Sequence, residues 1–282
     1  MLNPPMKRVL TAVVLIPVVL VLVFLPPSWQ WLFTAATAFV AALAAWEYLT
    51  LAQQKGSNPL RIAVVIAILA LFAAWFEWPD QLASIVGILS LVLLLVCTFS
   101  SPIARVLPDA SNAVFCLFYT GFTLLSLPAL RAQNNGPSLI VLLLCAVWVG
   151  DTAALYIGRP FGRHKLAPTL SPQKTWEGSI ASVIGSLLAA GLLLEIASYL
   201  VRWNSVKLSY ADEAWWYWLI LAVIINIAAQ VGDLAESALK RSAGVKDSGT
   251  MLPGHGGILD RVDALLLAAP ALWYAQVIHL RF

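Results

Sequence analysis

The chain has 282 residues, of which 61% are hydrophobic and 11% are charged, and its formal net charge is +3. A soluble domain carries about 25% charged residues, because its surface faces water. The composition therefore excludes an ordinary soluble globular protein and indicates a chain that lies largely within a lipid bilayer.

Nine apolar runs follow one another along the chain, each close to the length that a helix needs to cross about 30 Å of hydrocarbon. Such runs form helices, because lipid offers no water to satisfy backbone amide and carbonyl groups. We therefore predict an all-α, polytopic integral membrane protein with about nine transmembrane helices. The runs cover residues 9–25, 29–50, 61–78, 82–99, 112–130, 138–157, 179–201, 214–236 and 263–280.

The basic residues predict the orientation of these helices. If the N-terminus is cytoplasmic, only four of the 17 Lys and Arg residues fall on the opposite side, namely Arg131, Arg202, Lys207 and Arg281. Basic residues are retained on the cytoplasmic side during insertion. The N-terminus is therefore predicted to be cytoplasmic, and nine crossings place the C-terminus outside.

Polar residues divide the chain at about residue 140. Residues 1–140 form a predicted transmembrane scaffold of about five helices, with the carboxylate of Glu47 inside a span. Residues 141–282 form a predicted catalytic transmembrane region, whose polar residues concentrate in cytoplasmic loops 158–178 and 237–262.

The first polar segment combines Asp151 with the run Ser171-Pro172-Gln173-Lys174-Thr175. A carboxylate inside a span is costly, so Asp151 is expected to face a polar cavity; the alternative is a structural Asp paired with an Arg or a backbone amide. The later run is typical of a helix start, and its hydroxyls, free amides and ammonium group together suit a phosphate.

The second polar segment places Asp233, Ser237 and Arg241 at positions i, i+4 and i+8 if residues 233–241 continue the eighth helix. Asp260 and Asp263, three residues apart, supply another carboxylate face at the start of the ninth helix. The intervening glycines, Gly254, Gly256 and Gly257, would let the backbone approach a ligand closely.

Carboxylates beside several Lys and Arg residues, with no activated Ser or Cys, fit phosphoryl or nucleotidyl transfer, which depends on positioning and charge neutralisation. Asp oxygens suit magnesium. The alternative interpretation is a salt-bridged helical hairpin without a reaction. The three Cys are expected to pack as small apolar residues, and the three His show no spacing typical of a metal site.

Residues 237–263 resemble the signature of the phosphatidate cytidylyltransferases, also called CDP-diacylglycerol synthases, and match it at every defined position. The stretches 150–156 and 171–178 also resemble this family, so the likeness covers roughly the C-terminal half. It implies a membrane enzyme of phospholipid biosynthesis that joins CTP to phosphatidate, giving CDP-diacylglycerol and pyrophosphate.

The resemblance also implies a location and partners. The enzyme would lie in the bacterial inner membrane among membrane lipids, with its active site facing the cytoplasm, where CTP is found. It would act without a nucleic acid, and a homodimer is expected from the family. A phosphate monoester is mostly dianionic at pH 7, so phosphatidate would attack without a general base.

The residue roles follow from the chemistry and the resemblance together. Asp233 and Asp260 are assigned to Mg²⁺, and the family implies a second, monovalent cation such as K⁺. The expected phosphate ligands are Lys240, Arg241, Lys246 and Arg261 on one phosphate group, and Ser171, Lys174 and Thr175 on the other. The remaining candidates contact or orient the substrates or shape the loop: Asp151, Ser237, Asp247, His255, Gly256, Gly257 and Asp263.

Three other functions would make different demands on the sequence. A relative could carry out the same chemistry on another lipid phosphate, such as an ether-lipid phosphate, because apolar grooves leave little signature in a sequence. A lipid transporter or flippase would place charges along a transmembrane route, whereas here they gather at one face. A CDP-alcohol phosphotransferase would need an Asp-Gly-x-x-Ala-Arg element, which this sequence lacks.

Overall fold

The computed structural model describes residues 4–202, 208–249, 251 and 256–279, and 81% of the structure is helical. The all-α prediction is therefore confirmed, with the addition of one small hairpin. The helices are α1 (Pro4–Phe24), α2 (Gln30–Gln53), α3 (Arg61–Glu77), α4 (Leu82–Ser100), α5 (Val106–Cys116), α6 (Thr123–Arg131), α7 (Gly136–Phe161), α8 (Trp176–Arg202), α9 (Trp215–Ala243) and α10 (Leu259–His279). Short 3₁₀ turns cover Pro27–Trp29, Pro79–Gln81 and Ile103–Arg105, a π-helical segment covers Leu117–Phe122, and strands β1 (Lys165–Ala167) and β2 (Ser171–Thr175) form the hairpin.

All nine predicted apolar runs lie on helices, and the fifth lies on the continuous helical stretch Ile103–Arg131. Within the described residues, seven helices are long and apolar enough to cross a membrane. The two predicted runs that are not among these seven lie on α1 and α3. At 1.5 Å per residue the 17 residues of α3 reach about 26 Å, slightly less than the hydrocarbon thickness. The count of nine crossings and the orientation stay predictions.

The chain packs as two compact units. Unit 1 contains residues 1–128 and 239–262, and unit 2 contains residues 129–238 and 263–282. The predicted division at residue 140, between a scaffold and a catalytic region, stays a prediction. Packing divides the chain differently, because residues 239–262, which form most of the second polar segment, belong to the same unit as the first helices.

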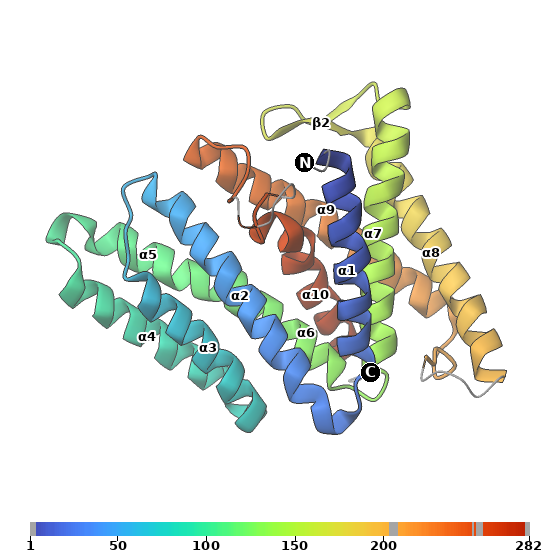
Figure 1. The fold of residues 1–282 in the computed structure, drawn as a ribbon, viewed down its shortest axis with the longest axis horizontal. Helices are drawn as coiled ribbons and strands as arrows, with labels where there is room; N and C mark the ends of the chain where they lie inside the picture. The colour runs from blue at the N-terminus through green and yellow to red at the C-terminus, as the bar shows by residue number, and fades with distance from the viewer. Residues whose placement is uncertain (1–3, 203–207, 250, 252–255, 280–282) are drawn as a thin grey trace. The chain divides into compact units, whose positions relative to one another are not determined.

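Helices α2, α3, α4 and α5 of unit 1 lie side by side (Figure 1). The α2 helix is rich in buried alanines, including Ala41, Ala44 and Ala45, which are fully buried. Small residues let neighbouring helices approach closely, which is how helices associate in lipid. Leu71 of α3 and Leu117 of the π-helical segment are also fully buried.

A buried carboxylate links the connections between these helices. Asp109 of α5 is fully buried, and its Oδ1 accepts hydrogen bonds from Ser57 Oγ at 3.1 Å and from the backbone amide of Asn58 at 2.6 Å. Its Oδ2 accepts one from Ser101 Oγ at 2.6 Å. Asp109 therefore joins the α2–α3 connection to the end of α4.

Unit 2 is built on α7 and α8, which lie side by side (Figure 1). Glycines line their contact: a Cβ atom at Gly158 would lie 3.2 Å from Cα of Gly178. Between the two helices, β1 and β2 pair antiparallel, with Lys165 opposite Thr175. The helical contact therefore places the hairpin at one end of the pair.

A buried polar network attaches α9 to α8. Asn226 is 1% exposed, and its Nδ2 donates to Ser182 Oγ at 2.9 Å and to Ser186 Oγ at 2.7 Å. Gln230 Nε2, one turn further along α9, donates to Asn226 Oδ1 at 2.7 Å. A side chain at Gly150 of α7 would collide with Asn226 Nδ2 at 2.4 Å. The network therefore fixes the three helices that carry Asp151, the hairpin and Asp233.

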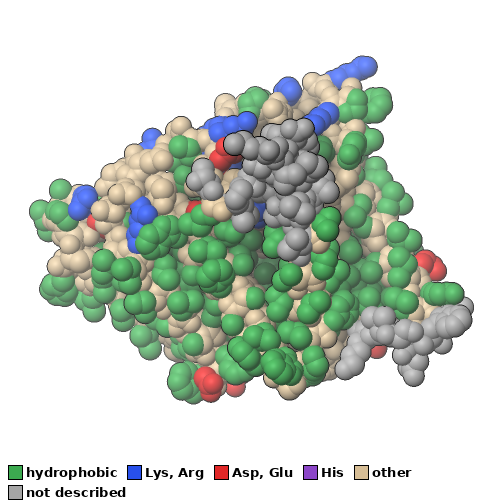
Figure 2. Space-filling view, in the orientation of Figure 1, with side chains coloured by type: hydrophobic (Ala, Val, Ile, Leu, Met, Phe, Trp, Pro, Cys, Tyr) green, Lys and Arg blue, Asp and Glu red, His purple; other side chains and the backbone are tan. Residues whose placement is uncertain are grey.

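Large apolar side chains point outward, as expected for helices that face lipid. Phe99 is 86% exposed and Leu107 is 77% exposed. Figure 2 shows hydrophobic side chains over much of the visible face. An exposed apolar surface of this extent is typical of a protein that spans a membrane rather than of a soluble one.

Candidate functional site

The structure brings together three site residues of unit 2, and they come from three different elements. Lys174 of β2 forms an ion pair with Asp233 of α9, with Nζ 2.6 Å from Oδ2, and both side chains are partly exposed. Asp151 of α7 is exposed and close enough to interact electrostatically with both groups. The result is a surface cluster of two carboxylates and one ammonium group, which can exchange partners with incoming anions and cations.

The hairpin that carries Lys174 differs from its sequence-based interpretation. Ser171–Thr175 was expected to start a helix, but it forms β2, and α8 begins at Trp176. The helix-capping part of that interpretation holds for Thr175, whose buried Oγ1 accepts the amide hydrogen of Gly178 at 3.2 Å. Pairing with β1 presents Lys174 toward Asp233, and local sequence carries no signal for this pairing.

The prediction that residues 233–241 continue the eighth helix is confirmed, because α9 runs unbroken from Trp215 to Ala243. Asp233 and Ser237 are hydrogen bonded one turn apart, with Ser237 Oγ donating to Oδ1 at 3.4 Å. A Cβ atom at Gly232 would lie 2.6 Å from the carbonyl oxygen of Asp263, so α9 packs tightly on α10 beside Asp233. This close packing brings Asp263 near Asp233 in unit 2.

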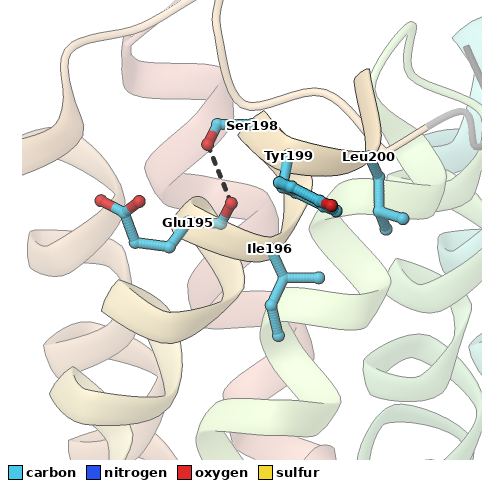
Figure 3. Close-up of a pocket in the computed structure, with 5 residues that line it drawn as sticks. All are labelled: Glu195, Ile196, Ser198, Tyr199 and Leu200. Atoms are coloured by element: carbon cyan, nitrogen blue, oxygen red, sulfur yellow. Dashed lines mark hydrogen bonds between the residues drawn. The ribbon is translucent and has the colours of Figure 1, made fainter. Parts of the chain in front are cut away.

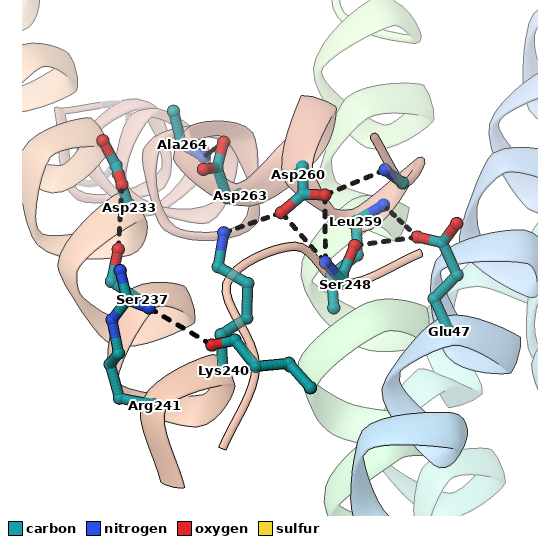
Figure 4. Close-up of polar contacts among 12 residues, drawn as sticks. Glu47, Asp233, Ser237, Lys240, Arg241, Ser248, Leu259, Asp260, Asp263 and Ala264 are labelled. Atoms are coloured by element: carbon teal, nitrogen blue, oxygen red, sulfur yellow. Dashed lines mark hydrogen bonds and ion pairs between the residues drawn. The ribbon is translucent and has the colours of Figure 1, made fainter. Parts of the chain in front are cut away.

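The second group of site residues belongs to unit 1 and centres on Asp260, in the first turn of α10 (Figure 4). Lys240 Nζ lies 2.6 Å from Asp260 Oδ1, and the two side chains are only 14% and 9% exposed. The backbone amides of Gly257 and Ser248 donate to Asp260 Oδ2 at 2.8 Å and 3.1 Å. Asp260 is thus a carboxylate held by an ammonium group and by the loop that precedes α10.

The other predicted loop residues differ in exposure. Lys246 and Asp247 are exposed, as are Arg241 of α9 and Arg261 of α10. Gly256 has a φ of +81°, a conformation that favours glycine, which agrees with its predicted role in shaping the loop. His255 lies outside the described residues.

Glu47 contacts the loop that holds Asp260, and the sequence did not predict this contact. It belongs to α2, in the part of the chain interpreted as scaffold, and it is 2% exposed. Its Oε2 accepts hydrogen bonds from Ser248 Oγ at 3.0 Å and from the backbone amide of Leu259 at 2.8 Å. The only signal in the sequence was a lone carboxylate in an apolar run, which does not reveal a partner about 200 residues away.

The donors assigned to magnesium fit that ion in type. Within the residues that the structure describes, no group of three or more His, Cys, Asp or Glu side chains is arranged to hold a metal. Asp233 and Asp260 offer anionic oxygens, and magnesium commonly takes one or two carboxylates and completes its shell with water and substrate phosphates. The two carboxylates belong to different units, so their joint binding of one ion stays a prediction, as does a monovalent cation.

A separate cavity of about 370 Å³ lies along α8 and is lined by Glu195, Ile196, Ser198, Tyr199 and Leu200 (Figure 3). Glu195 follows Glu177 by 18 residues of one helix, which corresponds to about 27 Å. The cavity therefore lies toward the opposite end of α8 from Lys174 and contains none of the predicted site residues.

The long apolar helices and the charged clusters around Asp233 and Asp260 are those of a multi-pass membrane protein. The sequence model of the cytidylyltransferase family matches residues 6–279. This chain therefore belongs to the cytidylyltransferase family.

Relatives named phosphatidate cytidylyltransferase match parts or nearly all of the chain. The protein of Brucella suis biovar 1 is 46% identical over 162 residues, which cover 56% of this chain and 54% of the relative. This match therefore spans about half the length of that relative. The protein of Haemophilus influenzae is 33% identical over 95% of this chain and 97% of its own length. The protein of Thermotoga maritima is 34% identical over 93% of each chain.

Proposed function

We propose that this protein is a nucleotidyltransferase that joins CTP to phosphatidate and releases CDP-diacylglycerol and pyrophosphate. The observation that carries the proposal is the family match across residues 6–279, together with relatives of that name aligned over nearly the whole chain. The charged clusters around Asp233 and Asp260 support it, because this reaction must bring two anions together. Neutralising charge is the main contribution of a protein to such chemistry.

In the proposed reaction an oxygen of the phosphatidate phosphate attacks the α-phosphorus of CTP. A new oxygen–phosphorus bond forms, the bond between the α-phosphorus and its bridging oxygen breaks, and pyrophosphate leaves with that electron pair. The second pKa of a phosphate monoester is about 6, so the nucleophile is already deprotonated at pH 7. The residues of the site therefore need to bind and orient the two substrates, not to remove a proton.

Lys174 and Lys240 are the cations that pair with Asp233 and Asp260. Lys174, in the more exposed pair, can move from its carboxylate to a phosphate oxygen, and Lys240 supplies a fixed positive charge beside Asp260. Arg241, Lys246 and Arg261 are exposed and supply further positive charge around the nucleotide phosphates. Ser171 and Thr175 flank Lys174 on the hairpin. Asp233 and Asp260 would hold Mg²⁺, which would neutralise phosphate charge when bound. Asp151, Ser237, Asp247, His255 and Asp263 orient these groups or contact the nucleotide.

We place this site on the cytoplasmic side of a bacterial inner membrane, where cytosolic CTP and the phosphatidate headgroup can both reach it. The distribution of Lys and Arg supports this orientation. A monovalent cation such as K⁺ and a homodimer complete the proposal.

The test incubates the purified full-length protein with Mg²⁺, phosphatidate and CTP labelled at the α-phosphate. We expect label in CDP-diacylglycerol and an equal amount of pyrophosphate. Sealed inside-out vesicles should form product from added CTP, whereas right-side-out vesicles should do so only after permeabilisation. A parallel reaction with an ether-lipid phosphate tests the other acceptor: product from that lipid alone, or from neither lipid, would overturn the proposal.

A further inference from the structure

Glu47 is a carboxylate buried within unit 1, and burial of a charge is costly unless hydrogen bonds compensate for the lost water. Two donors reach its Oε2, Ser248 Oγ at 3.0 Å and the amide of Leu259 at 2.8 Å (Figure 4). Leu259 is the first residue of α10, whose first amides have no partner within the helix. A carboxylate there is also favoured by the helix dipole.

Two glycines of the loop leave room for this carboxylate. A Cβ atom at Gly257 would lie 2.3 Å from Glu47 Oε2, and one at Gly249 would lie 2.5 Å from Glu47 Oε1. Both distances are far below van der Waals contact, so a larger residue at either position would displace the carboxylate or the loop. The loop between α9 and α10 is therefore shaped around a side chain from α2.

The residues that contact Glu47 also hold Asp260. The Ser248 hydroxyl donates to Glu47, while its backbone amide donates to both Asp260 oxygens, at 3.3 Å and 3.1 Å. Gly257, which packs against Glu47, donates its amide to Asp260 Oδ2 at 2.8 Å. Asp260 in turn pairs with Lys240 at 2.6 Å. A continuous set of contacts therefore runs from Glu47 through Ser248 to Asp260 and Lys240.

We propose that Glu47 is a positioning residue, which fixes the orientation of the Asp260 carboxylate by holding Ser248 and the first turn of α10. It does not touch the reacting atoms. The inference rests on the proposed function, because it takes its importance from the role assigned to Asp260. It gives α2 a part in the chemistry, although the sequence indicated only a scaffold there.

The position of the acceptor oxygen, more than the charge, is what this role requires. Glu47→Gln keeps an oxygen that can accept from Ser248 and Leu259, and its amide nitrogen replaces Oε1, which accepts no hydrogen bond from the described residues. Glu47→Ala removes the acceptor and leaves both donors without it. We therefore expect Glu47→Gln to rescue most of the function that Glu47→Ala loses.

The experiment compares the two variants with the wild-type protein as full-length chains in detergent. Folding is followed by thermal unfolding and size-exclusion chromatography, and turnover is measured over a range of CTP concentrations. We expect Glu47→Ala to lower kcat by about ten- to a hundredfold with a smaller change in KM, because a misplacement of about 1 Å within an active site costs rate on this scale. Glu47→Gln should stay within about fivefold of wild type.

Amide hydrogen exchange supplies a second readout. The amides of Ser248 and Gly257 donate to Asp260, not to Glu47. If Glu47 did not position Asp260, Glu47→Ala would leave both amides protected from exchange. Because we propose that it does, we expect both amides to exchange faster in Glu47→Ala. Unchanged exchange at both amides in the folded variant, or wild-type kcat, would overturn the inference.

Ser248→Ala keeps the test decisive if Glu47→Ala does not fold. It removes one donor to Glu47 but retains the backbone amide that holds Asp260. Its control is Ser90→Ala, since among the described residues the Ser90 hydroxyl donates to the carbonyl of Val86 in its own helix, at 2.8 Å. Lower kcat in Ser248→Ala alone supports the inference, and equal activity of both variants contradicts it. If the wild-type protein forms no CDP-lipid, the proposed function fails, whereas wild-type turnover in the variants rejects only the role of Glu47.

Discussion

Asp233 and Asp260 each meet a lysine ammonium group, at 2.6 Å in both cases. The two pairs differ in their surroundings. The Lys174–Asp233 pair is 26% and 38% exposed, whereas the Lys240–Asp260 pair is 14% and 9% exposed and is held by backbone amides as well. The first pair is therefore free to exchange partners with a substrate, and the second forms a more rigid part of the site.

We expect Lys174→Ala to lower turnover by about tenfold or more while leaving the fold intact. A partly exposed ion pair contributes about 1 kcal/mol or less to stability, whereas a charged hydrogen bond to a phosphate in the transition state contributes more to rate. Turnover and the midpoint of thermal unfolding should be measured on the same preparation. Lys55→Ala, which alters an exposed lysine in the α2–α3 connection, is the matched control.

Lys174→Arg separates charge from shape at this position. A planar guanidinium group does not replace a compact ammonium group at a crowded phosphate site, so we expect turnover between that of wild type and Lys174→Ala. Wild-type turnover in Lys174→Ala would instead leave the hairpin with a purely structural role.

At the scale of single elements, the connections of unit 1 depend on Asp109 more than on any exposed charge nearby. Its replacement by Ala would leave the Asn58 amide and the Ser101 hydroxyl without their acceptor, while the Ser57 hydroxyl would keep the carbonyl of Pro108. Loss of a buried carboxylate of this kind costs about 2–4 kcal/mol. We expect a clearly lower midpoint of thermal unfolding, with near-normal turnover in the protein that remains folded.

The control for this prediction is Asp80→Ala, because Asp80 is exposed in the short turn before α4. Its unfolding midpoint should match that of the wild-type protein. Equal midpoints for the two alanine variants would show that the Asp109 contacts do not hold the connections together.

The elements differ in how far the sequence predicts them. Apolar runs are local, and each of the nine predicted runs lies on a helix. The hairpin was missed, because Ser and Thr beside a helix start are equally consistent with a cap, and Thr175 does serve as one. Strand pairing depends on residues 165–167, which carry no pattern that marks them as a partner.

At the scale of the whole molecule, the family signature predicted the class of protein, and the match over residues 6–279 confirms it. The signature could not show what holds its own loop in place. Glu47 lies 201 residues before Ser248, and only packing of unit 1 reveals that they meet. The roles assigned to the site residues therefore came from chemistry and resemblance, and the contacts that position them came from the structure.

Turnover of Asp233→Asn and Asp260→Asn tests the central claim most directly, namely that these two carboxylates organise charge for cytidylyl transfer. Asn preserves size and removes one negative charge. Asp233 is the cleaner site, because its partial exposure makes misfolding of the variant a small risk. Product formation, magnesium-dependent CTP binding and thermal unfolding should be measured on one preparation of each variant. We expect folded proteins with weaker magnesium-dependent CTP binding and rates lower by about a hundredfold or more; folded variants with normal magnesium-dependent turnover would contradict the claim.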